Sequence, residues 1–80
     1  MSAELNRLRW RCQRGMLELD HILRGFLERG YPGASAEVKS QFERLLALED
    51  ADILDLILGR TEPPAGLSAV LVLLRLDREI

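Results

Sequence analysis

Apolar residues recur at three- and four-residue steps along most of this chain, and the pattern is clearest over Gly15–Arg29. One face of that segment carries four apolar side chains at helical spacing, those of Met16, Leu19, Leu23 and Phe26. This periodicity is typical of an amphipathic helix. On the polar face, Asp20 and Arg24 have the spacing of an i,i+4 ion pair. We therefore predict a helix over 15–29 whose apolar face packs into a core.

Two shorter helices are predicted on either side of this segment. The first covers roughly Ala3–Gln13, and its apolar face is formed by Leu5, Leu8 and Cys12. The second covers about Ala36–Leu48, with Ser35 as a candidate N-cap. Its apolar stripe consists of Val38, Phe42, Leu45 and Leu46. Before it, the sequence Tyr-Pro-Gly at 31–33 predicts a tight turn, because proline fixes φ and glycine tolerates a positive φ.

The C-terminal part of the chain predicts two more helices. Asp50 or Asp52 is expected to cap a short helix that ends at Gly59. Pro63 and Pro64 then prevent its continuation. A further helix begins near Ser68, with an apolar face made of Leu67, Val70, Leu71 and Leu74. Its β-branched residues leave a strand as the alternative, but no other segment offers a partner strand. The prediction is an all-α, compact single-domain bundle of five short helices spanning residues 1–80.

Charge argues for a protein partner rather than nucleic acid. The net charge of −2 is unlike that of a general nucleic-acid-binding protein, which is usually basic. The charge is also unevenly distributed: arginines gather at 7, 9, 11 and 14, and acidic residues at 43, 49, 50, 52 and 55. Such a dipolar surface suits a partner of complementary charge. Solvated helix faces are the plainer explanation of the same pattern.

Neither membrane insertion nor secretion is indicated by the sequence. The longest apolar run, Ala69–Leu74, is too short to span a bilayer, and no apolar region of a signal peptide follows the N-terminal charges. The single cysteine, Cys12, cannot form an internal disulfide or a structural zinc site. We therefore expect a cytoplasmic protein without membrane insertion.

No constellation of residues predicts an enzyme. His21 is the only histidine and lies three residues after Glu18, a spacing that permits contact on one helix face. A partly exposed helical histidine without a chemical role is the explanation that we favour. Cys12 lies on a leucine-rich face, where packing is the usual role of a lone cysteine. The sequence has no metal-ligand spacing and no phosphate-binding glycine loop. We expect no catalytic residues and no metal site.

The segment Trp10–Asp20, which reads WRCQRGMLELD, contains the most unusual local feature. Glycine inside a helix costs roughly 1 kcal/mol relative to alanine, so Gly15 marks either a helix break or a close approach to the backbone. Arg14 offers a planar donor group beside it. Glu18 lies one helical turn after Arg14, so the two either form an i,i+4 pair or present opposite charges together. A simple helix break with a surface ion pair is the plainer alternative.

The same segment resembles the small assembly factors of succinate dehydrogenase, which promote covalent attachment of FAD to the flavoprotein subunit. The resemblance covers nearly the whole chain and rests on features that follow in order: Trp10, Cys12, the Arg-Gly-x-x-Glu motif at Arg14, Gly15 and Glu18, Phe42 with Leu45 and Leu46, and Asp50 with Asp52. Two positions depart from the pattern of bacterial relatives. Gln13 stands where a second basic residue is common, and Leu56 stands where a tryptophan is common.

The resemblance implies a five-helix protein that binds a flavoprotein and performs no chemistry itself. The implied partners are the flavoprotein subunits of succinate dehydrogenase and of fumarate reductase. No cofactor would be stably bound, since the FAD belongs to the partner. The implied partner-binding residues are Arg7, Arg14, Gly15 and Glu18. Trp10 is expected to anchor the first helix to the bundle, with an exposed edge near the interface as the alternative. Asp20 is expected to pair with Arg24, with contact to the partner as the alternative.

Two alternatives to this function remain at the level of sequence. Some members of the same family have been labelled antitoxins of toxin–antitoxin pairs, and such a protein would also be small and partner-binding. The other alternative is a generic helical interaction domain with no link to flavin. Helical pattern and charge do not separate these three functions.

Overall fold

The computed structural model describes residues 3–78. Within this range the chain forms five α-helices and no strand. The helices are α1 (Ala3–Arg11), α2 (Leu17–Arg29), α3 (Ala36–Leu46), α4 (Asp50–Ile57) and α5 (Ser68–Arg78). The predicted all-α class and the number of helices are confirmed, including the helix in place of the alternative strand near residue 70.

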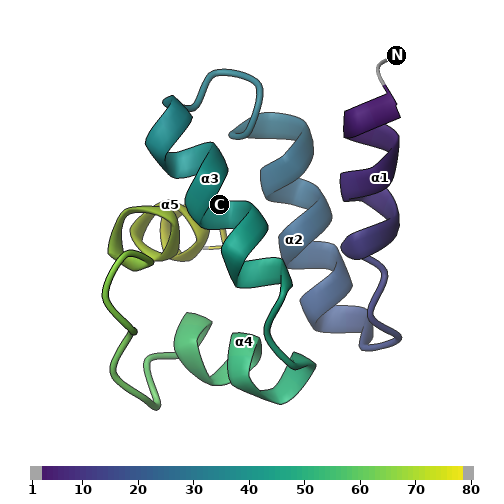
Figure 1. Cartoon of the computed structure of the whole chain (residues 1–80). Coiled ribbons are helices and arrows are strands. Elements are labelled where there is room, and N and C mark those ends of the chain that lie inside the picture. Colours follow the sequence, from purple (N-terminus) through teal and green to yellow (C-terminus); the bar gives the residue numbers. More distant parts are fainter. Residues whose placement is uncertain (1–2, 79–80) are drawn as a thin grey trace.

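The helices surround one apolar core. α1 lies beside α2, while α5 packs against α2, α3 and α4 (Figure 1). The core is built from the apolar faces predicted for each helix, and the side chains of Leu19, Leu23, Phe42, Leu45 and Leu74 are all fully buried. Phe42 stacks at a tilt against Phe26, with 5.0 Å between ring centroids. Burial of these faces explains why each amphipathic segment stays helical, since short isolated helices are marginal in water.

Several helix ends follow the sequence rules. The Ser35 hydroxyl accepts the backbone N–H of Val38 at 3.2 Å, as predicted for an N-cap. At the end of α4, Gly59 has φ +77°, and the N–H of Arg60 reaches back to the carbonyl of Asp55 at 2.8 Å. That bond is the mark of a Schellman motif, which favours glycine at this position. The turn at Tyr31–Ala34 also forms, although Gly33 does not use a positive φ there.

The remaining helix ends differ from prediction. Neither Asp50 nor Asp52 caps α4: the N-cap is Glu49, which has extended backbone geometry and makes no capping hydrogen bond with its side chain. Asp50 is the first helical residue, so its carboxylate is free to reach a neighbouring segment. α1 and α3 each end two residues earlier than predicted, and α2 begins two residues later. At the end of α3, the chain leaves the helix through i→i−3 bonds from Ala47 to Arg44 and from Leu48 to Leu45.

Candidate functional site

The loop that joins α1 to α2, residues 12–16, contains Arg14 and Gly15 of the motif and is attached through two of its backbone N–H groups to the side chain of Asp20. Gly15 has φ +82°, a conformation that costs a residue with a side chain roughly 1–2 kcal/mol. The carboxylate of Asp20 accepts the N–H of Arg14 at 2.7 Å and that of Gly15 at 3.2 Å. Because Asp20 belongs to the first turn of α2, these bonds attach the loop to the helix that follows it. A negative charge there also interacts favourably with the helix dipole.

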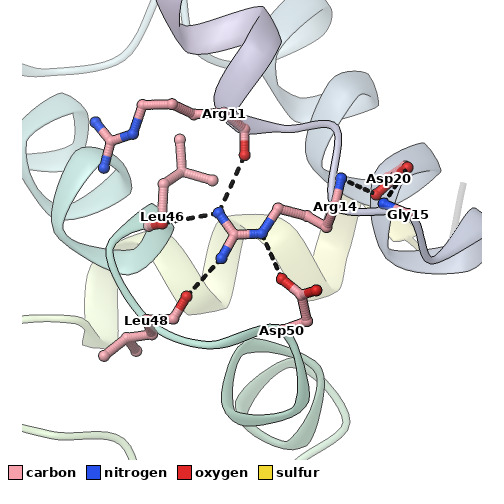
Figure 2. Close-up of polar contacts among 7 residues, drawn as sticks. All are labelled: Arg11, Arg14, Gly15, Asp20, Leu46, Leu48 and Asp50. Carbon is pink, nitrogen blue, oxygen red and sulfur yellow. Dashed lines mark hydrogen bonds and ion pairs between the residues drawn. The ribbon is translucent and has the colours of Figure 1, made fainter.

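The side chain of Arg14 turns inward from this loop (Figure 2). Its Nε donates to Oδ1 of Asp50 at 2.6 Å. Nη1 donates to the carbonyls of Arg11 and Leu46, at 3.1 Å and 2.8 Å. Nη2 donates to the carbonyl of Leu48 at 2.5 Å. Three of these four hydrogen bonds join the α1–α2 loop to the end of α3, the connection after it and the start of α4, and the fourth returns to the end of α1.

Part of the charge asymmetry seen in the sequence is thus satisfied within the fold. Arg14 of the basic region pairs with Asp50 of the acidic region, and Nη2 of Arg11 donates to the carbonyl of Glu43 at 3.0 Å. The Arg14 side chain is only 15% exposed. At such partial burial a charge-assisted hydrogen bond is stronger than its fully solvated counterpart.

Cys12 is the first residue of the same loop, and its side chain is fully buried in the core. Burial raises the pKa of its thiol to about 11, against the smaller opposing effect of the nearby Arg14 guanidinium. The thiol therefore stays protonated near neutral pH and packs as a small apolar group. A nucleophilic cysteine needs the opposite shift of its pKa.

The predicted site residues fall into an inward and an outward group. Arg7, Gly15 and Glu18 are exposed. The space beside the Gly15 α-carbon is open, because no atom beyond Gly15 and its two chain neighbours lies within 4 Å of where a Cβ would lie. Arg14 forms no ion pair with Glu18, because its guanidinium is directed to Asp50 instead. Gly15 and Glu18 are thus both exposed and lie three residues apart, whereas the arginine side chain is largely withdrawn from solvent.

Two expectations from the sequence are corrected by the structure. Trp10 does not anchor α1 to the bundle, since its side chain is 73% exposed. Leu8 and Cys12 face the core, and Trp10 lies between them in sequence on the opposite side of the helix. Asp20 does not pair with Arg24, because the backbone N–H groups of the loop occupy its carboxylate.

Sequence reasoning missed the partners of Arg14. Asp50 was expected only as a helix cap or as part of the family pattern, although its charge made it a candidate partner. The carbonyls of Leu46 and Leu48 carry no sequence signal, since every residue except the last has such a group. Leu17, 88% exposed beside the loop, was likewise not singled out.

The described residues offer no further chemical site. No group of three His, Cys, Asp or Glu side chains within residues 3–78 has the geometry to hold a metal ion. A groove of about 400 Å³ runs along α2 and is lined by residues that include Leu17, His21 and Glu28. None of the helices described is long and apolar enough to cross a membrane.

Comparison with known proteins assigns the family. Residues 6–77 match the family described as "Flavinator of succinate dehydrogenase". A FAD assembly factor from Pseudomonas aeruginosa is 43% identical over 76 residues, which cover 95% of this chain and 90% of that protein. Another from Methylococcus capsulatus is 42% identical over 65 residues, or 79% of this chain and 78% of its own length. No solved structure matches. The chain belongs to the succinate dehydrogenase flavinator family, as its sequence pattern led us to expect.

Proposed function

We propose that this chain promotes the covalent attachment of FAD to succinate dehydrogenase by binding the flavoprotein subunit of that enzyme. Membership of the flavinator family and the similarity to proteins named FAD assembly factors support the proposal. The structure of the α1–α2 loop is the observation that connects this proposal to particular residues. The loop is fixed from within, because Asp20 accepts a backbone N–H of the loop and the side chain of Arg14 donates to Asp50, while its outer side at Gly15 is open.

A fixed, open loop of this kind suits close contact between two protein backbones. Gly15 has no side chain to keep a partner away, and no atom of the chain itself fills the space. Glu18 lies exposed on the first turn of α2 and offers a carboxylate for a charged hydrogen bond. Leu17 and Trp10 add exposed apolar area on either side of the loop. Aromatic residues with this exposure are common anchors of protein interfaces.

On this proposal the chain supplies binding and orientation rather than a reacting group. The bond to the flavin forms within the flavoprotein, and a bound assembly factor would favour the conformation in which flavin and protein are correctly placed. The FAD is then a cofactor of the partner, and the chain needs no flavin site of its own. The flavoprotein of fumarate reductase is included in the proposal as a second client, and a cytoplasmic location fits both.

The test is made in bacterial cells that lack the gene for this chain. Covalent flavin on the succinate dehydrogenase flavoprotein is followed by fluorescence in a denaturing gel, with the chain supplied back or absent. We expect the chain to restore fluorescence, and Glu18→Ala to lower it with little change in melting temperature. His21→Ala is the matched control, because His21 is exposed one turn further along the same helix.

The outcomes separate the function from the site. Equal fluorescence with and without the chain would refute the proposal. Restoration by the chain and by Glu18→Ala alike would keep the function but remove Glu18 from the contact surface. The same gels, probed for the fumarate reductase flavoprotein, test the second client independently.

A further inference from the structure

The side chain of Arg14 joins segments that are far apart in the sequence. Its hydrogen-bond acceptors lie at the end of α1 (Arg11), at the end of α3 (Leu46), within the α3–α4 connection of residues 47–49 (Leu48) and at the start of α4 (Asp50). The last three are 32 to 36 residues from Arg14 along the chain. One side chain thus connects α1 and the loop after it to residues 46–50, as Figure 2 shows. We call residues 46–50 the α3–α4 corner.

The α3–α4 corner lacks the local groups that usually complete helix ends. The last carbonyls of a helix have no partner within it, and a glycine with positive φ often helps to satisfy them. The C-cap residue of α3 is instead Ala47, which has ordinary helical geometry, and the N-cap of α4, Glu49, makes no capping bond with its side chain. Arg14 supplies what is missing: its cation lies at the negative end of α3, and Asp50 lies at the positive end of α4.

The backbone of Arg14 lies next to Gly15, whose open side is the proposed contact surface for the partner. The N–H of Arg14 and the N–H of Gly15 both bind Asp20, so the peptide that precedes the open glycine is held at two points. The hydrogen bonds of the Arg14 guanidinium restrain this backbone on the side of the core, and the carboxylate of Asp20 in α2 restrains it on the other side. Release of the guanidinium would therefore remove one of the two restraints on the backbone next to Gly15.

We infer that Arg14 and Asp50 are positioning residues, which set the Gly15 surface by an intramolecular tie to the α3–α4 corner and do not contact the partner through their charged groups. The inference rests on the proposed function, because it concerns how the surface that binds the flavoprotein is held. Four of the five N–H groups of the guanidinium are used within the chain, and its side chain is 15% exposed. Glu18 and Gly15 are left as the residues of the motif that meet the partner.

The test compares Asp50→Ala with Asp52→Ala. Both variants remove one carboxylate from the first turn of α4, but only Asp50 touches Arg14. Two quantities are measured with the full chain: the rate of backbone hydrogen exchange at Arg14 and Gly15, and the dissociation constant for the purified flavoprotein subunit. We expect Asp50→Ala to speed the exchange and to weaken binding about tenfold, as the loss of a charge-assisted hydrogen bond implies. Asp52→Ala should leave the exchange rate unchanged.

A double-variant cycle then asks whether the two residues act as one unit. We expect Arg14→Ala combined with Asp50→Ala to bind no more weakly than Arg14→Ala alone, because both substitutions break the same tie. Additive losses would overturn the inference, as would weakened binding by Arg14→Ala with wild-type exchange at Gly15. Either result would mean that the guanidinium acts on the partner directly.

Two further measurements separate an effect on the loop from a loss of folding and from a failure of the proposed function. Asp50→Asn retains an acceptor oxygen and the size of the side chain, and it is compared with Asp50→Ala at a temperature where far-ultraviolet circular dichroism shows both folded. An exchange rate at Gly15 that neither variant changes would refute the tie. If the wild-type chain fails to bind the flavoprotein subunit, the proposed function fails, while the exchange rates of the free chain still decide whether Arg14 and Asp50 hold the loop.

Discussion

The carboxylate of Asp20 accepts the backbone N–H of Arg14 at 2.7 Å, across six residues of chain. It accepts the N–H of Gly15 with its other oxygen. A side chain from the first turn of α2 thereby accepts two backbone N–H groups of the loop before that helix. The N-cap of α2, Met16, has no capping side chain, so Asp20 is the main polar anchor of this helix start.

Removing this anchor should loosen the loop and destabilise the fold. Asp20→Ala leaves two N–H groups without their acceptor, and we expect it to lower the free energy of unfolding by roughly 1–3 kcal/mol. Asp20→Asn should cost less, because its amide keeps one acceptor oxygen. Thermal unfolding of both variants, with His21→Ala as a neighbouring exposed control, measures the effect. A melting temperature for Asp20→Ala equal to that of the wild type would contradict the anchoring role.

Gly15 combines a positive φ with open space, and substitutions can separate the two requirements. Asparagine tolerates positive φ better than other residues with a side chain, so Gly15→Asn should fold nearly as well as the wild type. Gly15→Ala and Gly15→Arg carry a strain of roughly 1–2 kcal/mol but meet no atom of the chain. If the open space serves the partner, all three variants should bind the flavoprotein more weakly, with arginine the worst. Binding by Gly15→Asn at wild-type strength would show that only the backbone conformation matters.

Alkaline pH should destabilise the chain through Cys12. Burial raises the pKa of its thiol from 9.0 to about 11, so between these values the unfolded chain loses the proton while the folded chain retains it. Stability is therefore full below pH 9.0 and falls as the pH rises to about 11. A shift of this size corresponds to roughly 2–3 kcal/mol. The pKa of Tyr31, also raised mainly by burial, acts in the same direction.

Urea unfolding across this pH range measures the effect, with Cys12→Ala as the comparison. The variant should begin less stable, because it leaves a small gap in the core, but should lose less stability as the pH rises. Parallel losses in the two proteins would mean that Cys12 ionises equally easily in both states.

The fold was accessible from the sequence because its helices obey local rules. The apolar stripe of α3, its Ser35 cap and the glycine that ends α4 each depend on residues within one or two helical turns. Each of these predictions is confirmed. Even the α5 segment with its β-branched residues becomes a helix, since the bundle offers a helical apolar face and no strand to pair with.

The site was accessible only in part, because its decisive contacts join distant segments. Arg14 was recognised, but its bonds to Leu46, Leu48 and Asp50 depend on how α3 and α4 pack against the loop. Helical spacing suggested Glu18 as a partner of Arg14, but the structure pairs Arg14 with the distant Asp50 instead. The prediction for Trp10 was wrong for a related reason. A large aromatic residue is usually buried, but Leu8 and Cys12 occupy the face of α1 that is turned to the core, so Trp10 lies on the solvent-exposed face.

The exposed Trp10 yields a direct optical test of the proposed contact surface, since it is the only tryptophan of the chain. At 73% exposure, its emission should already resemble that of a solvated indole and should change little on unfolding. Trp10→Ala should alter the free energy of unfolding by no more than about 0.5 kcal/mol. When the flavoprotein binds beside the α1–α2 loop, the indole should lose water and its emission should shift to shorter wavelength, and Trp10→Ala should weaken binding. Leu76→Ala, which removes an exposed apolar side chain from α5, is the control and should bind normally. A tryptophan spectrum that stays unchanged on binding would place the partner away from the end of α1.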